Sequence, residues 1–174
     1  MVLFTVFLTG SAGILAISWR SLRNPRLHGF YRFFAFECLL GLVLVGARTW
    51  FVDPLSARQI LSWVLLAASF LLAVHGFYLL WRFGEPKGGL EKTVRLVTRG
   101  AYRHIRHPLY ASLLAFGWGA FLKGPSPLTG VLALASSALL AATAKAEEKE
   151  SLEKFGDEYR SYMETTRMFV PHLI

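Results

Sequence analysis

Long apolar runs constrain this chain more than any other feature of its sequence. Residues 2–19 contain no charged side chain, residues 33–47 contain only Glu37, and residues 60–81 contain none apart from a histidine, His75. A bilayer core is about 30 Å thick, so a spanning helix needs about 20 mostly apolar residues. Charged residues make up 17% of the 174 residues, against about 25% in soluble domains. The pattern predicts an integral membrane protein and excludes a soluble globular domain.

Two shorter apolar runs follow, at residues 109–122 and 128–144, separated by the turn Lys-Gly-Pro-Ser-Pro at 123–127. Each is short for a full crossing, so the pair forms either two spans with interfacial ends or a re-entrant hairpin. We expect an all-α membrane protein with one domain over residues 1–174 and a C-terminal helical hairpin. It has about five transmembrane helices, approximately at 2–19, 31–50, 60–81, 108–122 and 128–145.

The basic residues are distributed unevenly between the two sides of this arrangement. Residues 20–32 hold four arginines, residues 82–106 hold seven Lys or Arg, and residues 145–174 hold five, which leaves three for the opposite side. The positive-inside rule places the 82–107 loop and the 146–174 tail in the cytoplasm and the N-terminus outside, in an inner or cytoplasmic membrane. Anionic membrane lipids explain the net charge of +8 without nucleic acid. We expect the first run to be a retained helix and not a signal peptide, because no basic residue precedes it.

Several classes of site are excluded by what the chain lacks. A single cysteine, Cys38, excludes a disulfide framework and a zinc cluster within the chain, and we expect no metal. The sequence contains no glycine-rich dinucleotide motif after a strand, no Walker loop and no nucleophile elbow. A nucleotide-like cofactor therefore has to bind helices and loops at the membrane surface.

The segment 96–110 is the densest polar cluster, with three Arg, two His and two Tyr before an apolar run. Pro108 fixes the start of a helix, which holds Arg106 and His107 at a helix N-terminus, where anions bind favourably. The segment is therefore either a carboxylate- or phosphate-binding site or a juxtamembrane basic collar with interfacial tyrosines.

Two ionisable residues, Glu37 and His75, lie inside predicted spans, both about 10 Å from the cytoplasmic ends. Intramembrane ionisable residues are candidates for a functional role. Their equal depth permits a pair, and a structural hydrogen bond explains them as well as a role in binding a substrate.

The C-terminal tail predicts a helix that continues the last span. Glu148, Leu152, Phe155, Tyr159 and Tyr162 fall on one helical face, which Gly156 weakens midway. Such a face suits an amphipathic helix lying on the membrane, although Glu148 at its head does not favour contact with anionic lipid.

Two separated motifs together carry a family resemblance. They read Leu96-Val97-Thr98-x-Gly100-x-Tyr102-x-x-x-Arg106-His107-Pro108-x-Tyr110 and Glu147-Glu148-x-x-x-Leu152-x-x-Phe155-Gly156-x-x-Tyr159-x-x-Tyr162, on either side of the hairpin. In this order and spacing they resemble the isoprenylcysteine carboxyl methyltransferase and phospholipid methyltransferase superfamily, over roughly residues 75–171. Ser112 departs from the family pattern, which often has glycine there.

The resemblance implies S-adenosylmethionine as methyl donor, bound where the loop and the tail form a cytoplasmic cap. It implies a cofactor site made of residues from both motifs: Val97, Gly100, Tyr102, Arg106, His107, Tyr110, Glu147, Glu148 and Tyr159. Arg82 matches the family's Gly-x-x-Leu-Arg helix end loosely and is expected to face the methyl acceptor. We expect catalysis to involve Arg82, Glu147 and Glu148, and acceptor binding to involve Glu37, His75, Arg82 and Arg167.

The resemblance thus predicts an S-adenosylmethionine-dependent methyltransferase for a lipophilic acceptor that arrives through the bilayer, of the isoprenylcysteine carboxyl methyltransferase type. A carboxylate acceptor needs little proton chemistry beyond alignment. A phospholipid amine is the alternative, and it would require a general base such as Glu37, His75 or one of the paired glutamates; a thiol acceptor is also open. Two other classes remain, a nicotinamide-dependent membrane reductase and a non-enzymatic membrane scaffold.

Overall fold

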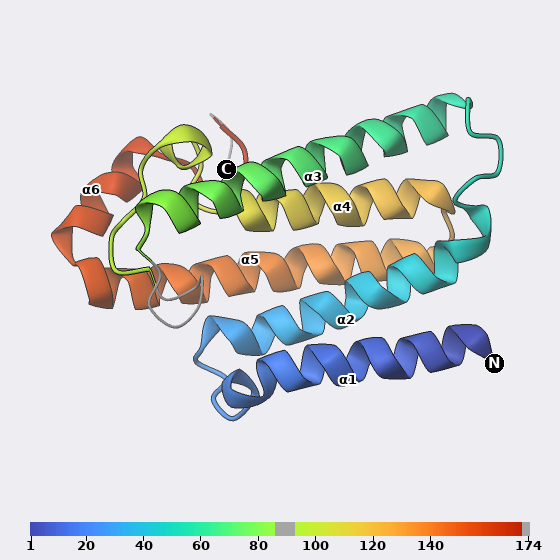
Figure 1. Ribbon diagram of the computed structural model, residues 1–174, viewed down its shortest axis with the longest axis horizontal. Helices are drawn as coiled ribbons and strands as arrows, with labels where there is room; N and C mark the ends of the chain where they lie inside the picture. Colours follow the sequence, from blue (N-terminus) through green and yellow to red (C-terminus); the bar gives the residue numbers. More distant parts are fainter. Residues whose placement is uncertain (86–92, 172–174) are drawn as a thin grey trace.

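The computed structural model describes residues 1–85 and 93–171, and the regular elements in them are all helical. The long helices lie side by side in the order α3, α4, α5, α2, α1, with α6 folded back at one end (Figure 1). The all-α expectation is confirmed. The elements are α1 (Val2–Leu22), α2 (His28–Gly46), the 3-10 helix η1 (Ala47–Thr49), α3 (Ala57–Phe83), the 3-10 helix η2 (Gly100–Arg103), α4 (Pro108–Lys123), α5 (Pro127–Phe155) and α6 (Asp157–Thr165).

Within the described residues, four stretches are long and apolar enough to cross a membrane: Val2–Leu22, His28–Thr49, Ala57–Phe83 and Pro127–Phe155. Helix α4 has 16 residues, which corresponds to about 24 Å, and it packs lengthwise between α3 and α5 (Figure 1). Helix α5 continues well beyond the predicted end at residue 145, and α3 is longer than predicted at both ends. A fifth crossing by α4 remains a prediction.

Helix starts follow local capping chemistry. Ser126 and Thr129 form a reciprocal capping box at the start of α5, where Pro127 occupies the first turn. Pro108 is likewise the first residue of α4, although the N-cap residue His107 makes no side-chain capping hydrogen bond there. Inside the row, the Ser62 hydroxyl of α3 donates to the Gly119 carbonyl of α4 at 2.7 Å, a polar tie of the kind that joins helices in apolar surroundings.

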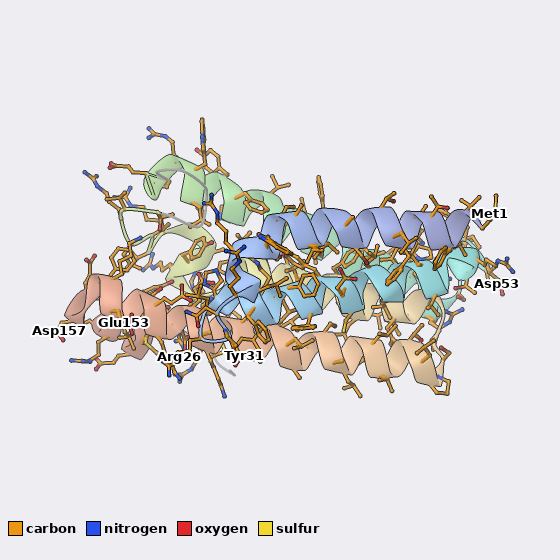
Figure 2. The ribbon with its side chains drawn as sticks, turned by 90° about the horizontal axis from the view of Figure 1, so that it is seen from below. Met1, Arg26, Tyr31, Asp53, Glu153 and Asp157 are labelled. Atoms are coloured by element: carbon orange, nitrogen blue, oxygen red, sulfur yellow. The ribbon has the colours of Figure 1, made fainter. Side chains whose placement is uncertain are left out.

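The row has two chemically different ends, shown in Figure 2. Met1 and Asp53 lie at one end, which we call the far end, while Arg26, Glu153 and Asp157 lie at the other, which we call the site end. Most of the basic residues counted above belong to segments at the site end, among them the α1–α2 loop, the α3–α4 connection and the C-terminal part of α5.

The tail does not form one continuous helix. Helix α5 ends at Phe155, Gly156 has a φ of +56°, and α6 begins at Asp157. A positive φ is readily adopted by glycine and strained for other residues, so Gly156 is the point where the chain reverses. The predicted face is therefore divided: Glu148 lies on α5, whereas Tyr159 and Tyr162 lie on α6 and turn back toward it.

Candidate active site

A buried ion pair lies at the centre of the site end. Arg106, two residues before α4, donates from Nε to Glu148 Oε1 of α5 at 2.6 Å, and both side chains are about 10% exposed. The ring nitrogen Nε2 of His107 lies 3.4 Å from the same oxygen. Buried charges require such pairing and hydrogen bonding. The two motifs, far apart in sequence, are therefore joined through Glu148.

Arg106 also binds the end of α6. Its Nη1 donates to the carbonyls of Thr166 at 2.6 Å and Met163 at 3.3 Å. Two of the three guanidinium nitrogens thus bind groups inside the protein. In this arrangement Arg106 orients Glu148 and anchors the tail, whereas the sequence suggested an open anion-binding position at the helix N-terminus.

The tail after α6 pairs with the chain that leads into α4. Ile105 and Arg167 form an isolated parallel bridge, with Arg106 N donating to Arg167 O at 2.7 Å and His107 N to Met168 O at 3.1 Å. Beyond the bridge, Phe169 packs near the His107 ring, with 6.1 Å between ring centroids. We call residues 166–170 the strap, because they hold the Arg-His-Pro segment from its outer side.

Glu147 occupies a different environment from its neighbour Glu148. Its Oε2 accepts a hydrogen bond from the Tyr110 hydroxyl at 2.5 Å, and it is partly exposed where Glu148 is buried. The Tyr110 ring stacks on the His107 ring with centroids 5.5 Å apart. The two adjacent carboxylates therefore have separate roles: one is held in an ion pair, and the other faces the aromatic residues.

Three tyrosines surround this carboxylate region. The Tyr162 hydroxyl donates to the Tyr102 carbonyl at 2.5 Å, and the Tyr159 and Tyr162 rings meet edge to face at 5.8 Å. Burial raises the pKa of all three phenols well above the usual range, and the Glu147 charge adds to the effect at Tyr102 and Tyr159. They remain neutral, and so act as hydrogen-bond donors and aromatic faces and not as bases.

The turn η2 positions Tyr102 above α3. Gly100 has a φ of +58°, and a Cβ there would lie 2.7 Å from both His75 Nε2 and Leu79 Cδ1. Val97 and Tyr102 pack with Leu79 in one buried cluster. Glycine at residue 100 therefore permits both the turn and its close approach to α3.

The four residues expected at the acceptor side come from α2, α3 and the strap, and their role remains a prediction. Arg82 is exposed at the end of α3, with its guanidinium over the Phe83 ring at 5.6 Å. Glu37 accepts from the Ser11 hydroxyl of α1 at 2.6 Å. His75 is exposed on α3 beneath Gly100, and within the described residues no hydrogen bond joins it to Glu37. Arg167 has a buried neighbour in Thr166 but is itself exposed.

Sequence reasoning missed the carbonyls of Met163 and Thr166 and the contact of Phe169 with His107. Backbone acceptors leave no side-chain pattern to find. Ser112, where the family often has glycine, is buried and donates its hydroxyl to the Leu109 carbonyl of its own helix at 2.7 Å, so the substitution is accommodated locally.

Two curated relatives match part of the chain. A methanethiol S-methyltransferase of Pseudomonas deceptionensis is 32% identical over 94 residues, which is 53% of this chain and 32% of the relative. Methanethiol S-methyltransferase 1 of Bradyrhizobium diazoefficiens is 28% identical over 112 residues, 63% of this chain and 39% of the relative. The matched stretch thus spans only about a third of the length of each relative. No solved structure matches the chain.

The phospholipid methyltransferase family model matches residues 57–158, more than half of the chain. This region runs from the start of α3 into α6 and contains the whole first motif, the second motif as far as Gly156, the paired glutamates and the rings of Tyr102, His107 and Tyr110. Tyr159 and Tyr162 lie just beyond it. With its apolar helices, the chain therefore belongs to the phospholipid methyltransferase family of membrane proteins.

Proposed function

We propose that this protein is an S-adenosylmethionine-dependent methyltransferase that acts on a lipophilic acceptor at the site end of the helix row. The observation that carries the proposal is the partly exposed Glu147 carboxylate, held by Tyr110 and neighboured by the rings of Tyr102 and Tyr159. The family membership and the names of the two relatives support methyl transfer as the reaction class.

The residues at this place fit the proposed cofactor. S-adenosylmethionine supplies a methyl group from a positively charged sulfonium. A carboxylate and aromatic faces are suitable neighbours for such a cation, and Glu147, Tyr102 and Tyr159 provide them. Among the described residues, Glu147 Oε1 has no recorded hydrogen bond, whereas Oε2 is bound by Tyr110. Glu148, Arg106 and His107 then have an indirect role: they hold α5, α4 and the strap in position around the site.

A thiol is the acceptor group that the comparisons favour, since both relatives are named for methanethiol. A thiol reacts as the thiolate, so its proton has to be transferred to a base. We assign the role of this base to Glu147 Oε1. A carboxylate acceptor of the isoprenylcysteine type would need no such proton transfer. The family name keeps a phospholipid amine as the second candidate.

The expected membrane arrangement belongs to the same proposal. The site end would face the cytoplasm, with the 82–107 loop and the 146–174 tail over the cofactor and the N-terminus outside, in one domain with five crossings. The gathering of basic residues at the site end supports this orientation. Single cysteines introduced at Asp53 and Asp157 in a Cys38→Ser background would test it. A membrane-impermeant thiol reagent added to intact cells should label only the residue-53 variant, and labelling of residue 157 instead would reverse the orientation.

The acceptor class can be decided with one set of matched compounds. Protein purified in detergent is supplied with methyl-labelled S-adenosylmethionine and with a thiol, a carboxylic acid or an amine of the same alkyl length. We expect label in the thioether, and much less of it with Glu147→Gln. Transfer to the amine or the acid alone would move the assignment to that acceptor, and transfer to none of them would contradict the proposal.

A further inference from the structure

An apolar groove runs along the outer side of α4. Its volume is about 510 Å³, and Leu65 of α3 forms one wall. Ala111, Ala115 and Trp118 contribute the α4 side, and Phe169 and Val170 of the strap lie at one end. Ala111 and Ala115 are one helical turn apart, so two small residues make a shallow floor between larger side chains.

Phe169 of the strap links the groove to the candidate active site. Ala111 directly follows Tyr110, whose hydroxyl binds Glu147. Phe169, at the same end, packs near the His107 ring at 6.1 Å and belongs to the cluster around Tyr110, Leu140 and Ala144. Figure 1 shows the strap, in red, passing beside α4. A chain lying in the groove would therefore bring its polar end to the strap, close to Tyr110 and His107.

We propose that this groove binds the hydrocarbon chain of the methyl acceptor, a single-chain lipophilic thiol, and directs its thiol toward Glu147. The inference rests on the proposed function and adds the substrate's shape to it. The commitment to one chain follows from continuity with the site: the residues that line the groove are apolar, and one of them, Phe169, also packs near the His107 ring.

The groove selects by position and shape, not by hydrophobic affinity. Lipid tails are as apolar as leucine side chains, so moving an alkyl chain from bilayer to groove gains little free energy. The benefit lies in holding the reacting atom in place, which lowers the cost of reaching the reactive geometry. The measurable consequence is a preference in kcat/KM for long-chain over short-chain thiols.

The test compares ethanethiol with dodecanethiol in the wild-type protein, in Ala115→Trp, which fills the groove, and in Val131→Trp, a matched insertion at an exposed position on α5. We expect Ala115→Trp to lower kcat/KM for dodecanethiol by about tenfold or more, as shape changes in apolar pockets do, while ethanethiol stays within about twofold of the wild type. Val131→Trp should change neither. Equal loss with both thiols in Ala115→Trp, or no loss with either, would overturn the groove.

A second readout does not depend on turnover. A dodecyl chain tipped with a photoreactive diazirine is cross-linked to the protein, and the labelled peptides are identified by mass spectrometry. We expect labelling within residues 111–122 that dodecanethiol displaces and that Ala115→Trp abolishes. This result would support the groove even if no thiol is methylated, and in that case only the proposed reaction would fail. Labelling there that dodecanethiol does not displace would show an ordinary lipid-facing surface and overturn the inference.

Discussion

The Tyr110 hydroxyl and the Glu147 carboxylate lie 2.5 Å apart and join the first turn of α4 to α5. This contact separates two carboxylates that are neighbours in the sequence. Glu148 turns to Arg106 and is buried, while Glu147 faces the tyrosines. The site thus combines a rigid ion pair that fixes the helices with a second carboxylate that remains able to act on a ligand.

Arg106→Ala should destabilise the protein strongly. Removing one partner of a buried ion pair leaves an uncompensated charge and costs about 3–5 kcal/mol, and here it also releases the carbonyls of Met163 and Thr166. The matched control is Asp157→Ala, which breaks the exposed pair with Arg160 and should matter little, because exposed pairs contribute weakly. Thermal unfolding in detergent measures both. Similar melting of the two variants would show that the Arg106–Glu148 pair is not a structural anchor.

Gly100→Ala should weaken cofactor binding as well as stability. A side chain there is strained at φ +58° and meets His75 and Leu79 at 2.7 Å, so η2 and Tyr102 have to shift. Gly13→Ala in α1 is the control, because nothing lies within 4 Å of its Cβ position and alanine favours a helix. Calorimetric titration with S-adenosylhomocysteine compares the two. Unchanged affinity in Gly100→Ala would remove the turn from the cofactor site.

Gln59→Ala should lower stability and leave cofactor affinity unchanged. At the far end, the buried Gln59 donates to the carbonyls of Thr49 and Val52 and accepts from Lys123 Nζ at 2.8 Å. Its loss removes two hydrogen bonds to carbonyls and leaves the buried Lys123 Nζ without the Gln59 oxygen, which costs about 1–3 kcal/mol. Arg48→Ala, exposed at the same end, provides the comparison. A large fall in S-adenosylhomocysteine affinity in Gln59→Ala would mean that the two ends of the row are coupled.

Tyrosine ionisation should be incomplete in the native protein at about pH 11, beyond the usual phenol pKa of about 10. Burial raises the pKa of Tyr102, Tyr159 and Tyr162. The unfolded chain therefore releases these protons at a lower pH than the native protein does. As a result, the free energy of unfolding falls as the pH rises above about 10. Ultraviolet titration of native and denatured protein checks this. Equal tyrosinate signals in both states at that pH would contradict the burial of the three rings.

Four long apolar helices could be predicted from the sequence, as could the two motifs, because apolar length and residue spacing are local properties. Contacts between helices could not. Glu37 and His75 lie at equal depth along their helices, yet Glu37 turns to Ser11 on α1 and His75 lies under Gly100. Rise per residue gives depth in the bilayer, whereas the direction around the helix axis depends on which neighbours pack there.

The candidate site shows the same difference between local features, which could be predicted, and contacts between distant segments, which could not. The sequence placed Arg106 at a helix N-terminus and so suggested an anion from outside, but the anion in the structure is Glu148 of the same chain. Gly156 was expected to weaken a helix, and its positive φ instead ends it and turns Tyr159 and Tyr162 back toward α5. The Arg106–Glu148 contact joins residues more than forty positions apart in the sequence. The turn at Gly156 depends on backbone geometry. Local sequence patterns contain neither kind of information.

The most direct measurement is thermal unfolding of the detergent-purified protein with and without S-adenosylhomocysteine, for the wild type and for Glu147→Gln. Ligand at about 100 times its dissociation constant should add about 2.7 kcal/mol to the free energy of unfolding. We predict a clear upward shift of the melting temperature in the wild type and a much smaller one in Glu147→Gln, with both proteins folded. An unchanged wild-type melting temperature at millimolar ligand, together with a rise on adding a nicotinamide dinucleotide, would contradict the account and favour a reductase.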